Sequence, residues 1–273
     1  MDENIAIPTT HLFAVLEEKL LSLLSSLTPE EWDKPTIAKL WTVKDVAAHL
    51  LDGNLRTISM LRDQYFGETI TNENLVAMLN RLNADFVTAM KRVSPALLVQ
   101  LMEVTGKQYT QLVTSGDPMA PAVFGVSWVG EQQSVNWFHV AREYTERWHH
   151  QQQIRDAVNK PGIVTRELYY PVIDTFMRAM PYTYRDTDAP ANTVVQVTVS
   201  GNAGGDWFLI KKDTWELVKE NGLPVTAHTI IDGGAAWKLF TKSWRRTNIA
   251  EHVQVRGDKR LAEPVLDMIA VVA

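Results

Sequence analysis

Cysteine is absent from the 273 residues of this chain. The chain therefore forms no disulfide framework, and it has no zinc site of the kind that cysteine thiolates build. It also carries no thiol nucleophile of its own. Any thiol chemistry at this protein therefore needs a thiol that another molecule supplies.

Long apolar runs and an excess of basic residues are also missing. No uninterrupted apolar stretch reaches about 18 residues, so no transmembrane helix is expected. The acidic start, MDENIAIPTT, lacks the apolar core of a signal peptide. The net charge of -5 comes from interspersed acidic and basic residues, a pattern that does not favour nucleic acid as a partner. The sequence predicts a cytoplasmic protein with no membrane or nucleic-acid partner.

The spacing of apolar residues changes once along the chain. Hydrophobic residues make up 45% of the sequence, ample for a sizeable core. Up to Met180 they recur at helical spacing, and we expect helices over residues 10–26, 42–66, 72–93, 94–116, 134–158 and 165–180. After Pro181 the period becomes two, and we expect strands over residues 192–200, 207–211, 214–219, 226–231 and 252–256 and helices over residues 235–244 and 261–271. A boundary near Asp186 gives domains of residues 1–185 and 186–273.

The expected helix over residues 134–158 carries the pattern that points to chemistry. Glu146 and His150 are four residues apart, so their side chains meet one turn apart on the same face. A carboxylate and an imidazole at this spacing can hold a divalent metal between them. His149 points about 100° away from His150, so the two neighbours are not expected to do the same job.

A metal site needs a third ligand, and His49 is the best candidate. Its helix begins with Thr42 as an N-cap and Asp45 three residues on, a variant of the capping box. His49 lies at the edge of the apolar stripe that follows. A histidine in such a place more often makes a hydrogen bond in a core than binds a metal. The metal interpretation is favoured by the second helix with its own pair of ligands.

Further patterns leave alternatives open. His139 and Glu143 form another pair on the face of the helix that carries Glu146. For this pair, hydrogen bonding to a metal ligand or packing in the core is favoured over binding of a second metal. The apolar loop over residues 116–133 either covers a substrate or folds back on the helices. The glycines between residues 201 and 205 separate two expected strands and open no helix, so a hairpin turn is favoured over a phosphate loop.

The residues around these histidines resemble the metal motifs of a known superfamily. The run WTVKDVAAHL, residues 41–50, resembles the start of the second helix in DinB-like proteins, where a tryptophan precedes the helix and a histidine in its first turns binds metal. The run ERWHHQ, residues 146–151, resembles their second metal motif, in which two ligands stand four apart and the second closes a His-His pair.

One departure from that motif narrows the resemblance. The usual first ligand is a histidine, and this chain has Glu146 instead. In this it resembles the branch that contains mycothiol-dependent maleylpyruvate isomerase, where two histidines and a glutamate bind zinc. The resemblance implies His49, Glu146 and His150 as ligands of one divalent metal, with zinc expected first and nickel or manganese as alternatives. It covers about residues 8–160.

The C-terminal part shows a weaker likeness. The order of its elements, and IDGGAAWKLF followed by VQVRGD, resemble the sterol-carrier-like domain attached to many members of this branch. The resemblance thus implies a DinB-like four-helix bundle followed by a small α+β sterol-carrier-like domain. Arg245 and Arg246 are candidates to anchor an anionic substrate, because the guanidinium fork matches a carboxylate. A solvated helix end is the alternative role for these two arginines.

The implied activity is that of a metal-dependent enzyme. It would use a low-molecular-weight thiol similar to mycothiol to isomerise a small electrophile such as maleylpyruvate, or to transfer the thiol to it. Three protein ligands leave an open position for water or substrate. Two other functions stay open: a metal- or apolar-ligand-binding module without catalysis, and a metal-dependent hydrolase that activates water.

Overall fold

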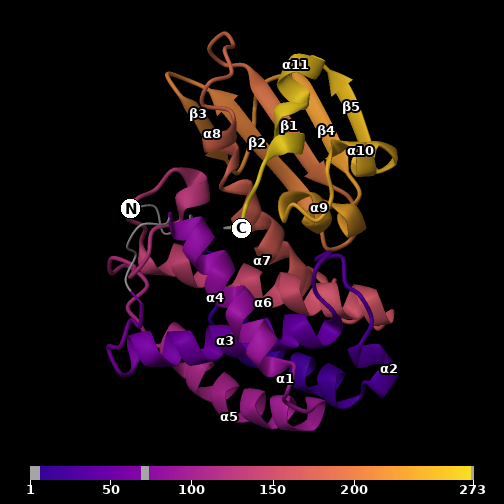
Figure 1. The fold of residues 1–273 in the computed structure, drawn as a ribbon. Coiled ribbons are helices and arrows are strands. Elements are labelled where there is room, and N and C mark those ends of the chain that lie inside the picture. Colours follow the sequence, from indigo (N-terminus) through magenta and orange to yellow (C-terminus); the bar gives the residue numbers. More distant parts are fainter. Residues whose placement is uncertain (1–6, 69–73, 272–273) are drawn as a thin grey trace. The chain divides into compact units, whose positions relative to one another are not determined.

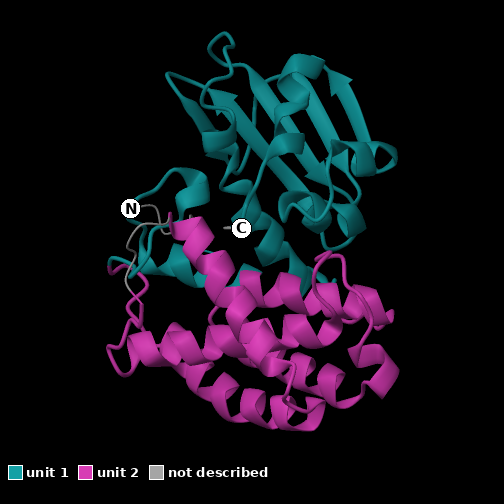
Figure 2. Ribbon diagram, viewed as in Figure 1, with its two compact units in different colours: residues 1–7, 121–145, 164–272 teal, residues 8–120, 146–163, 273 magenta. Residues whose placement is uncertain are grey.

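The computed structural model describes residues 7–68 and 74–271. Two compact units make up the chain, the first from residues 1–7, 121–145 and 164–272 and the second from residues 8–120, 146–163 and 273 (Figure 2). The long helix α6 (Asn136–Val158) belongs to both, because residues 136–145 lie in unit 1 and residues 146–158 lie in unit 2.

Unit 2 is a bundle of helices. It contains α1 (Leu12–Ser25), α2 (Pro29–Trp32), α3 (Val43–Leu61), α4 (Leu75–Met90), α5 (Pro95–Thr114) and the second half of α6 (Figure 1). Helix α3 packs against α4 and α5, and α1 packs against α5. The helices expected here are confirmed, although α3 ends at Leu61 rather than near residue 66. The expected start of α4, residues 72 and 73, lies outside the described residues.

A capping box starts the helix that carries His49, as the sequence predicts. The Thr42 hydroxyl accepts a hydrogen bond from the backbone N–H of Asp45 at 3.3 Å, and the Asp45 carboxylate accepts one from the backbone N–H of Thr42 at 3.0 Å. Two N–H groups that the first helical turn leaves without partners are satisfied in this way. The residues at the start of α3 therefore fix where this helix begins. The start in turn sets the direction in which the His49 side chain projects from the helix.

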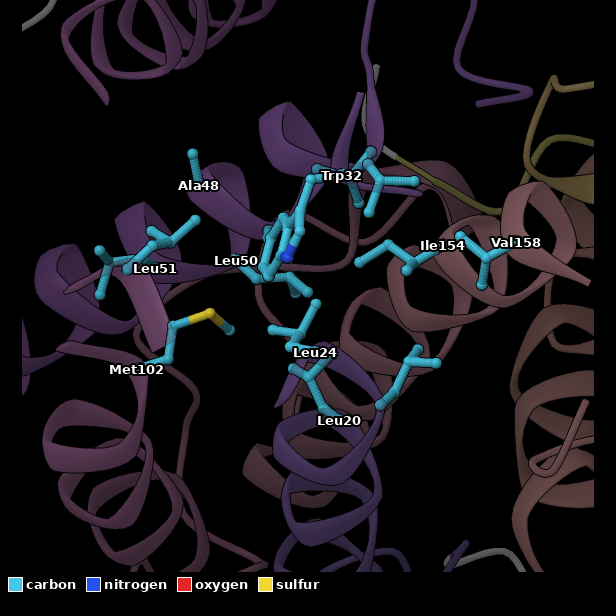
Figure 3. Close-up of a cluster of buried hydrophobic side chains, with 14 of the residues drawn as sticks. Leu20, Leu24, Trp32, Ala48, Leu50, Leu51, Met102, Ile154 and Val158 are labelled. Carbon is cyan, nitrogen blue, oxygen red and sulfur yellow. The ribbon is translucent and has the colours of Figure 1, made fainter. Parts of the chain in front are cut away.

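One apolar core joins the helices of unit 2. Figure 3 shows Leu24 of α1, Trp32 of α2, Leu50 of α3, Met102 of α5 and Ile154 of α6 in this cluster, each at most 5% exposed. Burial of a leucine-sized side chain stabilises a fold by roughly 1.5–3 kcal/mol. Because α3 and α6 share this core, their positions relative to one another are set by packing as well as by hydrogen bonds.

Unit 1 contains a mixed sheet of five strands. These are β1 (Val194–Val199), β2 (Gly205–Lys211), β3 (Trp215–Val218), β4 (Ala227–Ile231) and β5 (Val253–Gly257), in the order β3-β2-β1-β4-β5 (Figure 1). Strand β1 is parallel to β4, and the other neighbouring strands are antiparallel. A helical part followed by an α+β part confirms the predicted fold class.

Short helices accompany the sheet in unit 1. They are η1 (Ser127–Val129), α7 (Arg166–Met177), α8 (Met180–Thr183), α9 (Gly233–Phe240), α10 (Arg246–Ile249), η2 (Ala250–His252), α11 (Lys259–Ala262) and η3 (Pro264–Asp267). Helix α11 packs against β1, β4 and β5. Among the described residues, no helix has the length and hydropathy needed to cross a membrane.

The turn between β1 and β2 confirms the hairpin interpretation of the glycine cluster. The register pairs Val199 with Gly205 across the turn. A Cβ on Gly204 would lie 1.9 Å from the backbone oxygen of Val199, so only glycine fits there. The chain needs these glycines to reverse direction, which accounts for the cluster without a bound phosphate.

The final predicted helix, over residues 261–271, is wrong. The chain instead forms the one-turn α11 and, after it, the 3-10 helix η3, which begins at Pro264. Proline has no backbone N–H to donate and its ring clashes with the preceding turn. In this chain the helical turn ends before Pro264, although the apolar residues on either side are spaced as for one continuous helix.

The boundary predicted near Asp186 falls inside unit 1 rather than between the units. The Tyr184 hydroxyl donates to the backbone oxygen of Leu261 at 2.9 Å. The Trp215 indole donates to the backbone oxygen of Thr187 at 2.9 Å. The chain on both sides of the boundary is thus bound to the sheet unit, and cleavage at this place stays a prediction.

The two ends of the apolar loop before α6 pair with one another within unit 1. Pro121 pairs with Val135 in an isolated bridge, and the backbone N–H of Ala122 donates to Ser134 at 2.9 Å. Val126 and Trp128 inside the loop are buried. Its apolar residues thus contribute to a folded segment, and the covering of a substrate by this loop stays a prediction.

Candidate metal site

Glu146 and His150 face one another on α6, as their spacing predicts. Oε2 of Glu146 lies 3.7 Å from Nε2 of His150. The other ring nitrogen, Nδ1, lies 3.0 Å from Oε1 of Gln153. A proton on Nδ1 is donated to this amide oxygen, which leaves the lone pair of Nε2 directed toward the carboxylate. Two acceptors that face each other favour a cation between them, and a hydrogen bond at the second nitrogen is typical of metal-binding histidines.

Helix α3 brings His49 to the same place. The ring centroids of His49 and His150 are 4.7 Å apart, with the rings at 76° to one another. The Trp41 ring, just before α3, lies 4.8 Å from His49 and 6.5 Å from His150, again between centroids. The structure thus places His49 of α3 beside His150 of α6 and beside the Trp41 ring. The group of described residues whose ligand atoms all lie within 4.8 Å of one another is Glu146, His149 and His150, and it does not include His49.

The residues present fit a divalent metal. Within residues 7–68 and 74–271, the buried Nδ1 of His49 has no hydrogen-bond partner. A buried polar atom left in this way costs about 1–3 kcal/mol, a penalty that a bond to a metal would remove. Two imidazole nitrogens and a carboxylate oxygen are a ligand set that zinc commonly takes at catalytic sites, where a fourth position stays open.

His149 lies closer to this cluster than helical geometry predicts. Its Nδ1 is 3.7 Å from Oε2 of Glu146, and its ring centroid is 3.9 Å from that of His150. The ligand atoms of Glu146, His149 and His150 all lie within 4.8 Å of one another. The expectation that His149 stands apart is therefore wrong as to position. Two candidate triads share Glu146 and His150, one completed by His49 and the other by His149.

Both central imidazoles are held in the neutral form. Burial lowers the pKa of His49 well below its usual value, and the neighbouring His150 lowers it further. Burial likewise lowers the pKa of His150, with His149 as the next cause. Metals bind the neutral imidazole, so both rings have a lone pair available near neutral pH.

The second pair on α6, His139 and Glu143, is bound to an arginine. Nη2 of Arg142 lies 2.5 Å from Oε1 of Glu143 and 3.0 Å from Nδ1 of His139. One guanidinium thus occupies acceptors of both residues. This contact favours a structural role for the pair over the alternative of a second metal.

The two candidate arginines for substrate binding lie in unit 1, where Arg245 is the N-cap residue of α10 and Arg246 its first residue. Nε and Nη2 of Arg246 each lie 2.7 Å from a carboxylate oxygen of Asp267, and its Nη1 lies 3.2 Å from Glu263. The fork of Arg246 is therefore occupied within its own unit. Arg245 is exposed, and its backbone N–H donates to the side chain of Asn248 at 3.1 Å.

Sequence reasoning missed Arg147, which connects the two helices that carry the histidines. Its Nη1 donates to the backbone oxygen of Leu50 at 3.1 Å. A signal was present in α1, where Glu17 interrupts a run of buried apolar residues. A buried acidic residue needs a partner of opposite charge, and Arg147 supplies it at 2.8 Å.

The fold and this cluster define a class of protein: a helical bundle that gathers histidines and a carboxylate from two of its helices, followed by an α+β part. The family model described as the mycothiol maleylpyruvate isomerase N-terminal domain matches residues 13–155, just over half of the chain. The chain therefore belongs to the mycothiol maleylpyruvate isomerase family, and the resemblance found in the sequence is confirmed.

Two solved structures share the fold. A crystal structure of the mycothiol-dependent maleylpyruvate isomerase is 10% identical, with a TM-score of 0.54, and the match covers 90% of each chain. A crystal structure of a histidine-to-alanine mutant of the mycothiol-dependent maleylpyruvate isomerase is 9% identical, with the same TM-score and coverage. No match is found among curated proteins. At these identities the likeness establishes the fold alone.

Proposed function

We propose that this protein is a metal-dependent enzyme that uses a low-molecular-weight thiol of the mycothiol kind to isomerise a small electrophile such as maleylpyruvate. The observation that carries the proposal is a pair of contacts at His150 of α6: its ring lies against that of His49 of α3, and its Nε2 lies 3.7 Å from Oε2 of Glu146. Family membership supports the thiol and the substrate class. The absence of cysteine agrees with a thiol that comes from outside the chain.

His49, Glu146 and His150 would hold the metal through two ring nitrogens and one carboxylate oxygen, and zinc is the expected ion. When bound, such an ion lowers the pKa of a neighbouring thiol or water and stabilises negative charge that develops on a substrate oxygen. As the single anionic ligand, Glu146 leaves a zinc site with a net charge near +1. This residual charge favours an anionic thiolate or substrate.

The residues around the ligands orient them and restrict water. Gln153 holds the proton of His150 at Nδ1, through the contact at 3.0 Å, and so keeps Nε2 as the metal-facing atom. The indole of Trp41 lies beside both histidines. An apolar ring in this place displaces water, and electrostatic attraction is stronger where water is excluded.

An anionic substrate also needs a cationic partner, and Arg245 and Arg246 are our candidates. A guanidinium fork matches a carboxylate in shape and charge. Because Arg246 already binds Asp267 and Glu263, it would have to exchange these partners for substrate. Arg245 is therefore the first of the two to test.

The test combines metal analysis with an assay of thiol dependence. Purified protein is expected to hold about one divalent ion per chain, and maleylpyruvate is expected to isomerise only when mycothiol and the metal are both present. Hydrolysis of the substrate without thiol would favour the hydrolase. A folded protein that binds metal but catalyses neither isomerisation nor hydrolysis would favour the binding module. Protein that binds no divalent ion would contradict the proposal.

A further inference from the structure

A buried ion pair lies inside the helical bundle of unit 2, and one of its two members, Arg147, directly follows the proposed ligand Glu146. Arg147 of α6 is 7% exposed and Glu17 of α1 is 8% exposed. Nη2 of Arg147 lies 2.8 Å from Oε2 of Glu17, and the guanidinium carbon lies 4.4 Å from the centroid of the Tyr109 ring. Desolvation of two charges costs free energy that apolar residues of similar volume would avoid. Stability alone therefore does not account for this pair.

Arg147 also binds the helix that carries His49. Its Nη1 donates to the backbone oxygen of Leu50 at 3.1 Å. Leu50 directly follows His49 in the chain, and Arg147 directly follows Glu146. One guanidinium therefore connects the backbone beside a ligand on α3 to the residue beside a ligand on α6.

Gln151, which directly follows His150, extends this cluster. It is 0% exposed, and in the described part of the chain neither its amide nitrogen nor its amide oxygen has a hydrogen-bond partner. The same holds for Oε1 of Glu17. Glu17, Arg147 and Gln151 border a cavity of about 10 Å³. A cavity of this volume holds about one water molecule, which could bond to the carboxylate and to the amide.

The network reaches the neighbour of every proposed ligand: His49 is followed by Leu50, Glu146 by Arg147 and His150 by Gln151. We propose that this buried network, completed by one water molecule in the cavity, positions the metal ligands of α3 and α6 relative to one another, with Arg147 as the central positioning residue. The inference rests on the proposed function for its metal. It also makes a statement about the metal-free protein, where the network holds the two histidines at their observed separation.

Hydrogen bonds suit this task better than apolar packing does. Metal–ligand distances must be met to within about 0.2 Å, whereas apolar cores accept substitutions that shift helices. A guanidinium offers several donors in a rigid plane, so its two contacts fix direction as well as distance. Helix α5 has a glycine, Gly106, opposite the Glu17 carboxylate. A Cβ at this position would lie 2.1 Å from Oε1 of Glu17, so the glycine leaves room for the carboxylate.

The test uses a charge-neutral replacement and a matched control on the same helix. The double variant Glu17→Leu with Arg147→Met removes both charges and leaves no single buried charge behind. The control is Arg155→Met. Arg155 is 8% exposed, and it donates to the backbone oxygens of Lys160, Pro161 and Lys19 at 3.0–3.1 Å, but no proposed ligand adjoins it.

Two measurements are made on each folded protein. Titration with Co²⁺, followed by its visible spectrum, is expected to show at least about tenfold weaker binding and an altered spectrum for the double variant, and neither change for Arg155→Met. In the metal-free proteins, the imidazole NMR signals of His49 and His150 are expected to shift in the double variant and to stay in place in the control. Unchanged cobalt binding and unchanged imidazole signals in the double variant would overturn the proposal.

The outcomes separate this inference from the proposed function. If the parent protein binds no cobalt but its imidazole signals shift in the double variant, the metal is wrong and the positioning role stands. If the double variant does not fold, Arg147→Lys decides, because lysine keeps the charge but lacks the planar fork: weaker cobalt binding supports the proposal, and full affinity overturns it. A high-resolution crystal structure without an ordered water in the cavity would remove Gln151 from the network.

Discussion

The imidazole of His49 lies against that of His150, with 4.7 Å between ring centroids and the rings nearly perpendicular. The two residues come from different helices, which share an apolar core and are joined by the hydrogen bond from Arg147 of α6 to Leu50 of α3. These neutral imidazoles, with the Glu146 carboxylate beside His150, are the basis on which we propose a metal site here.

The first prediction distinguishes the two triads. His150→Ala is expected to abolish metal binding, because both triads need this residue. His49→Ala is expected to do the same, while His149→Ala largely retains the metal, since family resemblance favours the triad with His49. Isothermal titration of the three variants with zinc measures this. Loss of zinc in His149→Ala but not in His49→Ala would assign the third ligand to His149.

Sequence reasoning found the helix pair because its signals are local. The four-residue spacing of Glu146 and His150 fixes their encounter whatever the rest of the chain does, and the Thr42 capping box fixes the start of α3. The position of His149 was missed because a side chain's rotamers move its ring far from the direction that the Cα position alone indicates. Arg147 was missed because its partner Glu17 comes from a distant helix, and pairing across helices depends on packing.

The second prediction concerns the charge of Glu146. Glu146→Gln keeps an oxygen donor but removes the negative charge. We expect zinc affinity to fall about ten- to a hundredfold or more, by analogy with the loss of affinity when residues that hydrogen-bond metal ligands are mutated. Glu143→Gln is the control, because Glu143 is bound by Arg142 at 2.5 Å. Competition with a colorimetric chelator measures both. A site emptied by Glu143→Gln and left filled by Glu146→Gln would show that the ligand assignment is wrong.

The third prediction concerns the boundary near Asp186. Residues 185–192 are largely exposed, and limited proteolysis is expected to cut there first. The cut chain is expected to stay together on gel filtration, because Tyr184 on the N-terminal side of the cut is bound to Leu261 on the C-terminal side. Two fragments that separate and remain folded would instead establish residues 1–185 and 186–273 as independent domains.

The fourth prediction concerns pH. The ammonium of Lys160 and the backbone N–H of Thr28 hold the pKa of Glu31 below its usual value. A carboxylate with a lowered pKa in the folded state adds stability above its unfolded-state pKa, and this stability is lost as the pH falls through the folded-state pKa. Urea unfolding is expected to show Glu31→Gln less stable than the parent near neutral pH and equal to it in acid. A difference that persists unchanged into acid would contradict this assignment.

The last prediction concerns a glycine that serves the buried network. Gly106 lies within α5, where alanine normally stabilises a helix by about 0.8–1 kcal/mol. Here a Cβ would lie 2.1 Å from Oε1 of Glu17, and that carboxylate cannot move aside without loosening its bond to Arg147. We therefore expect Gly106→Ala to destabilise the parent protein and to weaken its cobalt binding.

The matched background for Gly106→Ala is the double variant Glu17→Ala with Arg147→Met, in which the obstructing carboxylate is gone. There the same alanine is expected to stabilise, so the sign of its effect on the free energy of unfolding reverses. Urea unfolding of the four proteins gives this coupling directly, since residues in contact show interaction energies of about 0.5–3 kcal/mol. Equal effects of the alanine in both backgrounds would mean that Glu17 is free to move, and that α5 does not hold the acid against Arg147.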